Sequence, residues 1–111
     1  MSADLIERRV LAVARDRMGE TAVLALQGAR SVGKSTVLSA LAAGWERPIV
    51  DLDRPGQVDL VAASPEDFVE GSRPVFIDEY QRVPELLQAI KAELNRDGSV
   101  GQFVLTGSTR F

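Results

Sequence analysis

Short apolar runs alternate with segments of helical periodicity along this chain of 111 residues. The apolar runs predict four strands, at residues 21–27, 48–52, 75–77 and 102–106. Apolar residues at helical spacing predict four helices, at residues 3–18, 35–43, 65–70 and 84–96. This alternation is typical of an α/β fold in which helices cover both faces of a mainly parallel sheet.

Finer features of the pattern predict which residues are buried. Residues 21–27 are almost all apolar, so we expect the first strand to be buried on both faces. Residues 53–63 contain Pro55 and Gly56 and predict a loop with one helical turn. The helix faces expected to be buried carry Ile6, Val10, Val13 and Ala14 in the first helix, and Leu87, Ile90 and Leu94 in the last.

Residues 28–35 fit the phosphate-loop pattern G-x-x-x-x-G-K-[ST] without a mismatch. A predicted strand precedes them and a predicted helix follows, which is the context that the pattern requires. Backbone N–H groups of such a loop cradle phosphates, Lys34 should reach the β- and γ-phosphates, and Ser35 should ligate Mg²⁺. The predicted nucleotide-binding residues are therefore Gly28, Ala29, Arg30, Ser31, Val32, Gly33, Lys34, Ser35 and Thr36. The alternative is a glycine-rich turn without a ligand.

Acidic and hydroxyl side chains end the third and fourth predicted strands. Asp78 follows an apolar strand, as does the acid that holds Mg²⁺ in phosphate-loop nucleotidases, and Glu79 is placed to activate a water molecule. Ser108, or as second choice Thr106, could contact the γ-phosphate or the attacking water. Each group also has a purely structural interpretation, as a polar residue at the end of a strand.

Several other residues are open to two interpretations. Asp51 and Asp53 could hold a second substrate or Mg²⁺, although solvated loop acids are more usual. Trp45 could stack on adenine, although packing is the commoner role of tryptophan. Arg82 could serve a neighbouring subunit or form an ion pair.

The composition limits the residue types that could take part in catalysis. The chain contains neither cysteine nor histidine, so catalysis would depend on carboxylates, lysine, hydroxyls and backbone amides. The net charge of −3 does not indicate a nucleic-acid partner. No apolar stretch is long enough to predict a membrane span or a signal peptide, and we expect a cytoplasmic protein.

Three segments, residues 28–35, 75–86 and 103–108, together resemble the N-terminal domain of a prokaryotic family of AAA-like ATPases. Members of that family usually carry a C-terminal domain of unknown function. The resemblance covers about residues 21–108 and implies an ATP-binding core with strand order 5-1-4-3-2 and Mg²⁺-dependent hydrolysis. The roles that it implies are phosphate and Mg²⁺ binding for Lys34 and Ser35, Mg²⁺ binding and water activation for Asp78 and Glu79, and sensing for Thr106 or Ser108.

The chain stops at Phe111, directly after the fourth predicted strand. We therefore expect one incomplete phosphate-loop core over residues 1–111, with an N-terminal helix at 3–18 and a nucleotide-binding part at 21–111. Compared with the family, the fifth strand, the helical lid and any later arginine finger are absent, which leaves strand order 1-4-3-2. Hydrolysis should then be weak or absent, and the first strand becomes an edge that could pair with a second copy.

Three functions follow from these observations. The first is a Mg²⁺-dependent ATPase module, with ATP and Mg²⁺ as its ligands. The second is a small-molecule kinase that uses Asp51 and Asp53 to hold an acceptor. The third is a nucleotide-dependent switch that binds ATP and does not hydrolyse it.

Overall fold

The computed structural model describes residues 2–26, 34–71 and 73–107, and the side chains of residues 8–26, 36–71 and 73–107. In chain order the elements are α1 (Ser2–Met18), β1 (Val23–Leu26), α2 (Lys34–Gly44), β2 (Ile49–Asp51), α3 (Pro55–Ala63), α4 (Pro65–Val69), β3 (Val75–Asp78), the 3-10 helix η2 (Tyr80–Arg82), α5 (Glu85–Arg96) and β4 (Phe103–Thr106). All the predicted strands and helices are present, with ends shifted by up to two residues, so the predicted alternation is confirmed.

The strands in the described part of the chain form one sheet in the order β1-β4-β3-β2, and all three strand pairs are parallel. The α/β class and the order 1-4-3-2 are therefore confirmed. Because the strands are parallel, their carboxyl ends meet along one side of the sheet, here called the carboxyl edge. It carries Leu26, Asp51, Asp78 and Thr106, and the side where the strands begin is the amino edge.

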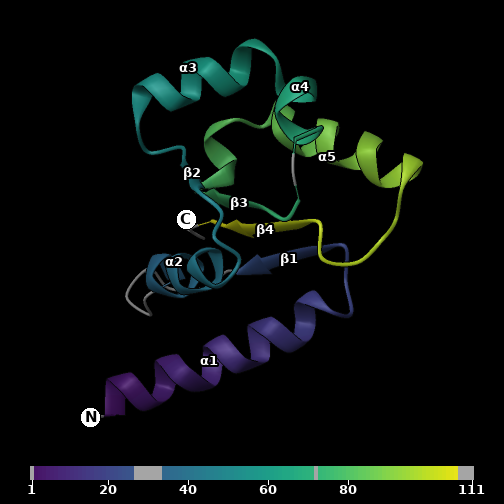
Figure 1. Cartoon of the computed structure of the whole chain (residues 1–111). Coiled ribbons are helices and arrows are strands. Elements are labelled where there is room, and N and C mark those ends of the chain that lie inside the picture. The colour runs from purple at the N-terminus through teal and green to yellow at the C-terminus, as the bar shows by residue number, and fades with distance from the viewer. Residues whose placement is uncertain (1, 27–33, 72, 108–111) are drawn as a thin grey trace.

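Helices cover both faces of the sheet, in three layers (Figure 1). Helices α1 and α2 pack on one face, where Leu38, Phe76 and Val104 are fully buried. On the other face α3, α4 and α5 enclose a second core that includes Ile77 and Leu86. Phe76 and Ile77 are successive residues of β3, and they enter opposite cores because side chains alternate along a strand.

The predicted burial of α1 and β1 is partly wrong. Among the α1 side chains that the structure describes, Ala14 is buried as predicted and Met18 is buried too, whereas Val10 and Val13 are 41% and 55% exposed. Ile6 lies outside the described side chains. Small Ala14 faces α2, so the helix is rotated from the face that the larger valines suggested. The β1 residues are half-buried, apart from exposed Ala25, because β1 is the outermost strand of the described sheet.

Residues 53–63 form helix α3 over Pro55–Ala63 rather than the predicted loop. Pro55 occupies the start of the helix, where a backbone N–H has no partner inside the helix, so proline causes no loss there. Val61 is buried in the core and Val58 packs against it. The proline and glycine that suggested a loop therefore mark a helix start.

The predicted buried face of α5 is partly confirmed. Ile90 is buried and Leu94 is partly buried, as predicted, but Leu87 is exposed, and Leu86, Ala89 and Glu93 are buried in addition. Leu86 and Leu87 each begin a stripe at helical spacing, and the structure uses the stripe that contains small Ala89 and ends at Glu93. Glu93 can be buried because two arginines contact its carboxylate.

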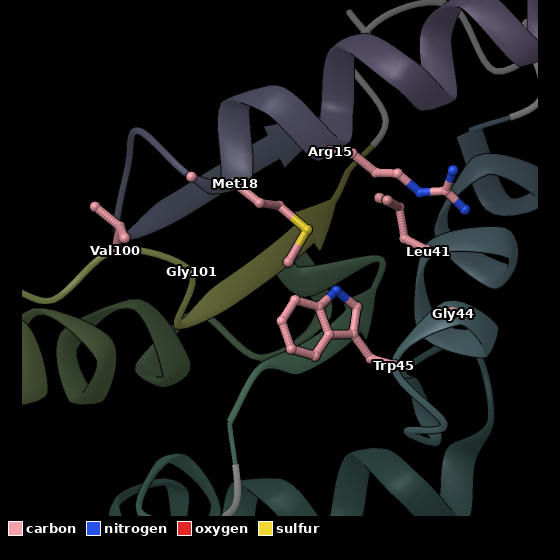
Figure 2. Close-up of a pocket in the computed structure, with 8 residues that line it drawn as sticks. Arg15, Met18, Leu41, Gly44, Trp45, Val100 and Gly101 are labelled. Atoms are coloured by element: carbon pink, nitrogen blue, oxygen red, sulfur yellow. The ribbon is translucent and has the colours of Figure 1, made fainter.

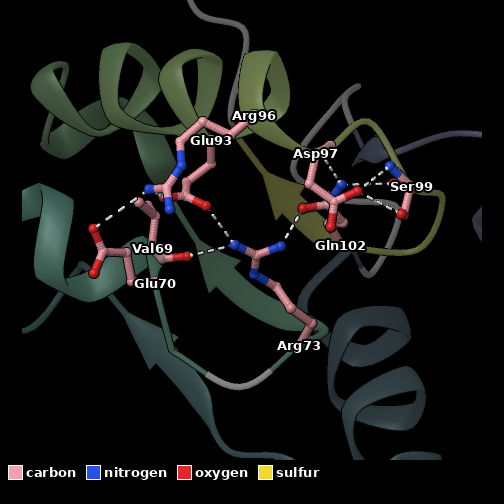
Figure 3. Close-up of polar contacts among 8 residues, drawn as sticks. All are labelled: Val69, Glu70, Arg73, Glu93, Arg96, Asp97, Ser99 and Gln102. Carbon is pink, nitrogen blue, oxygen red and sulfur yellow. Dashed lines mark hydrogen bonds and ion pairs between the residues drawn. The ribbon is translucent and has the colours of Figure 1, made fainter.

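Arg73 is the centre of a polar cluster at the amino edge (Figure 3). Its guanidinium donates hydrogen bonds to the Val69 carbonyl at 3.0 Å, to Glu93 Oε1 at 2.9 Å and to Gln102 Oε1. The same group lies 4.9 Å from the centre of the Phe103 ring. The cluster thus ties α4 and α5 to the start of β4, and we regard it as structural.

Candidate active site

The carboxyl edge brings several predicted site residues together. Asp78 ends β3 and Glu79 follows it, Thr106 ends the adjacent β4, and Leu26 pairs with Thr106 at the end of β1. Helix α2 begins at Lys34, and residues 27–33 between it and β1 lie outside the described part of the chain. The edge therefore unites the acidic pair with the strand that precedes the phosphate-loop motif.

Some predicted residues cannot be placed in the same way. Gly28, Ala29, Arg30, Ser31, Val32, Gly33 and Ser108 lie outside the described residues. Lys34 and Ser35 are the first two residues of α2, but their side chains lie outside the described part. Thr36, the third residue of α2, is exposed.

The Thr106 hydroxyl links the two acidic residues. It donates a hydrogen bond to Asp78 Oδ1 and accepts one from the backbone N–H of Glu79, at 3.2 Å. Thr106 is 1% exposed, so both hydrogen bonds are shielded from water. The sequence suggested a sensor at Thr106, and its hydroxyl lies between the carboxylate of Asp78 and the backbone of Glu79.

Glu79 has an unusual backbone conformation. Its φ of 61° and ψ of 54° lie in the left-handed region, which residues other than glycine and asparagine rarely adopt. Its carboxylate accepts a hydrogen bond from Gln81 Nε2 at 2.6 Å. This contact could not be predicted from the sequence, because residue spacing does not reveal that the backbone of Glu79 is left-handed.

Asp51 and Asp53 make local contacts beside this site. Asp51 Oδ1 accepts a hydrogen bond from the Asp53 N–H at 3.0 Å, and Asp53 Oδ1 lies 3.1 Å from the Arg82 guanidinium. Arg82 therefore forms an ion pair within the chain. Both side chains of that pair are more than half exposed, which makes it a weak contact.

Trp45 lies far from the candidate active site. It lines a cavity of about 550 Å³ at the amino edge, with Arg15, Met18, Leu41 and Val100 among its neighbours. Figure 2 shows the Met18 side chain directed at the indole ring. Helix α2 separates Trp45 from Lys34 by 11 residues, about 16 Å. Its position therefore favours packing over stacking on a nucleotide base.

The described acids fit Mg²⁺ only as part of a nucleotide complex. No group of three or more acidic side chains that could hold a metal occurs in the described residues. Mg²⁺ in nucleotide sites commonly takes one or two carboxylates and completes its octahedron with phosphate oxygens and water. Asp78, held by a neutral hydroxyl at the carboxyl edge, matches that requirement.

Comparison with known proteins gave one match. A family model described as an AAA domain matches residues 20–111. Searches of curated proteins and of solved structures found no match. In addition, none of the described helices has the length and apolar character required to span a membrane.

Proposed function

We propose that this chain, which belongs to the AAA domain family, binds ATP with Mg²⁺ and hydrolyses it to ADP and phosphate. Family membership identifies it as an AAA-type ATPase domain, which associates it with nucleotide binding in general. The observation that supports hydrolysis is the acidic pair Asp78 and Glu79, which the Thr106 hydroxyl links next to the end of β1, the strand that precedes the phosphate-loop motif in the sequence.

In this proposal the phosphate loop and the start of α2 bind the triphosphate. The N–H groups of residues 28–33 and the positive end of the α2 dipole attract phosphate oxygens. Lys34 neutralises the β- and γ-phosphates, and Thr36 lies near the α-phosphate. Ser35, and Asp78 through water, would hold Mg²⁺ beside the phosphates. The ion would withdraw negative charge from the phosphate oxygens.

The Glu79 carboxylate then orients a water molecule for attack in line with the bond that breaks. The water oxygen bonds to the γ-phosphorus, the bond to the ADP oxygen breaks, and the water proton passes through Glu79 to solvent. Thr106 keeps Glu79 and Asp78 in register, and Ser108 serves as a further contact to the γ-phosphate. This arrangement requires no histidine, consistent with the composition.

Two variants test the proposal. Glu79→Gln should lower the turnover number for Mg²⁺-ATP by about 10²–10⁴-fold and leave ATP affinity nearly unchanged. Lys34→Ala should weaken ATP binding itself, because it removes charge from the phosphate site. The matched controls are Glu66→Gln, an exposed acid on α4, and Lys91→Ala, which changes the only other lysine. Unchanged turnover in both Glu79→Gln and Lys34→Ala would refute the assignment.

A kinase remains the second candidate, because a cavity of about 340 Å³ lies beside β2 at the carboxyl edge. It is lined by Leu52, Asp53, Pro55, Val58, Asp59 and Arg82. ATP consumption that depends on an added hydroxyl or amine acceptor would select this function. Binding of ATP by calorimetry without any phosphate release would instead select the nucleotide-dependent switch.

Self-association through β1 is a further part of the proposal. In the described sheet β1 has a neighbour on one side only, and an apolar edge strand can pair with a second copy. Sedimentation velocity over a range of protein concentrations tests this pairing. A single monomeric species at all concentrations would exclude it.

A further inference from the structure

The chain reverses at Glu79, directly after β3. Glu79 is one of two residues other than glycine that have a positive φ in the described part of the chain. The left-handed residue leads into the short 3-10 helix η2, Tyr80–Arg82. This turn brings the Gln81 side chain next to that of Glu79, just beyond the end of β3.

Gln81 contacts the Glu79 carboxylate through its amide group. Gln81 Nε2 donates a hydrogen bond to Glu79 Oε1 at 2.6 Å. The amide NH₂ is the only end of that side chain that can donate to a carboxylate, so the amide oxygen must point the other way. The contact therefore fixes the orientation of both groups.

Gly107 leaves room for this arrangement at the end of β4. A Cβ built on Gly107 would lie 2.7 Å from Tyr80 Cε2, closer than real Cβ atoms come, and 3.0 Å from Gln81 Oε1, which is a tight contact. The side chains of Tyr80 and Gln81 therefore pack against Gly107. The Gln81 amide lies between the Glu79 carboxylate on one side and Gly107 on the other.

The described contacts of the turn separate Gln81 from the arginine that follows it. The guanidinium of Arg82 lies 3.1 Å from Asp53, toward β2. The Gln81 amide, a neutral donor, contacts the Glu79 carboxylate and can give it a direction. A carboxylate that orients water needs a defined direction and must remain able to accept a proton.

We infer that Gln81 is a positioning residue, which holds the Glu79 carboxylate in the orientation used for water activation, and that Gly107 provides the space for it. This inference rests on the proposed function, because it assigns Gln81 a role in the step that Glu79 performs. Gln81 itself touches neither the nucleotide nor the water in this scheme. Its contribution should appear in turnover rather than in nucleotide binding.

The test compares Gln81→Met, which keeps the length of the side chain and removes the donor, with the control Gln88→Met at an exposed position of α5. Gln81→Met should lower kcat by about 10–100-fold and leave KM and the affinity for a fluorescent ATP analogue within about twofold. Gln81→Glu should lower kcat further by repulsion, and Gly107→Ala should lower it by displacing the amide. Gln88→Met should behave as the unaltered chain.

A second measurement separates this inference from the proposed function. In a Glu79→Gln background, Gln81→Met should cause no further loss of kcat, because both changes act on one group. The NMR resonance of the Gln81 side-chain amide should shift in the Glu79→Gln variant, whether or not turnover is measurable. The role of Gln81 would be overturned if Gln81→Met left kcat unaltered, raised it, or lowered kcat and affinity equally. It would also be overturned if the Gln81 amide resonance did not move in the Glu79→Gln variant. Unchanged turnover in Glu79→Gln would refute the proposed function instead.

Discussion

Strand β4 has a polar network at each of its ends, and the two networks differ in the charge of the groups that contact their acidic side chains. At the amino edge Arg73 and Arg96 contact the Glu93 carboxylate at 2.9 and 3.0 Å, so charges of opposite sign meet directly. At the carboxyl edge the described hydrogen bonds to the two carboxylates come from the Thr106 hydroxyl, which donates to Asp78, and from the Gln81 amide, which donates to Glu79.

This difference separates a structural network from a candidate catalytic one. Direct pairing with arginine neutralises Glu93 and allows it to be buried between α4, α5 and β4. The donors described for the two acids of the carboxyl edge are a hydroxyl and an amide, which are neutral groups that orient a carboxylate. Two oriented acids at one edge of the sheet suit a magnesium nucleotide, in which Mg²⁺ commonly takes one or two carboxylates.

The largest expected effect on stability is at the amino edge. Glu93→Ala removes the carboxylate from a largely buried ion pair, and we expect it to lower the free energy of unfolding by about 2–4 kcal/mol. Urea denaturation measures this loss. The control Glu70→Ala breaks an exposed contact to Arg96 at 3.9 Å and should cost less than about 0.5 kcal/mol. If Glu93→Ala changed the kcat of the folded protein, the two networks would not be separable.

Thr106→Val should have a smaller effect on stability and a larger one on turnover. Valine fills nearly the same space but removes the hydroxyl that joins Asp78 to the Glu79 N–H. We expect a loss of about 1–2 kcal/mol in unfolding free energy and a fall in kcat of about 10–100-fold. Steady-state kinetics and urea denaturation on the same sample would measure both. A stability loss with unchanged kcat would make the carboxyl-edge network structural as well.

The smallest expected effect concerns Asp97, after α5. Hydrogen bonds from the Ser99 hydroxyl and N–H lower the pKa of Asp97 in the folded chain. The stabilisation that they give is therefore present above the pKa that Asp97 has in the unfolded chain, and it is lost as the pH falls through the pKa of Asp97 in the folded chain. Ser99→Ala should therefore lower stability slightly near pH 7 and less near pH 3. Urea denaturation at several pH values measures this. A difference that grows toward acid pH would contradict the assignment.

Element types were predictable because each depends on local patterning. Apolar runs bounded by polar segments located all four strands, and the resemblance to AAA-like ATPases supplied their order. Residues 53–63 were mispredicted because proline ends one helix and begins another equally well. The burial of Leu86 rather than Leu87 could not be predicted, because packing against β3 and β4 chooses between two equivalent stripes.

The candidate site was predictable in its residue types but not in its connections. A strand that ends in Asp78 and Glu79 is visible in the sequence, and so is Thr106 at the end of another strand. Their hydrogen bonds depend on the parallel pairing of β3 with β4, which joins residues 28 positions apart. The contact from Gln81 depends on the left-handed backbone at Glu79, which no residue type near it requires.

The cavity around Trp45 gives the protein a built-in optical probe. Trp45 is the only tryptophan in the chain, and its ring, 54% exposed, lies between the end of α1 and the end of α2. Its emission should shift to longer wavelength when these helices separate and the indole becomes fully hydrated. Because Trp45 is about 16 Å from the start of α2, intrinsic fluorescence can follow unfolding of this layer without direct interference from a bound nucleotide.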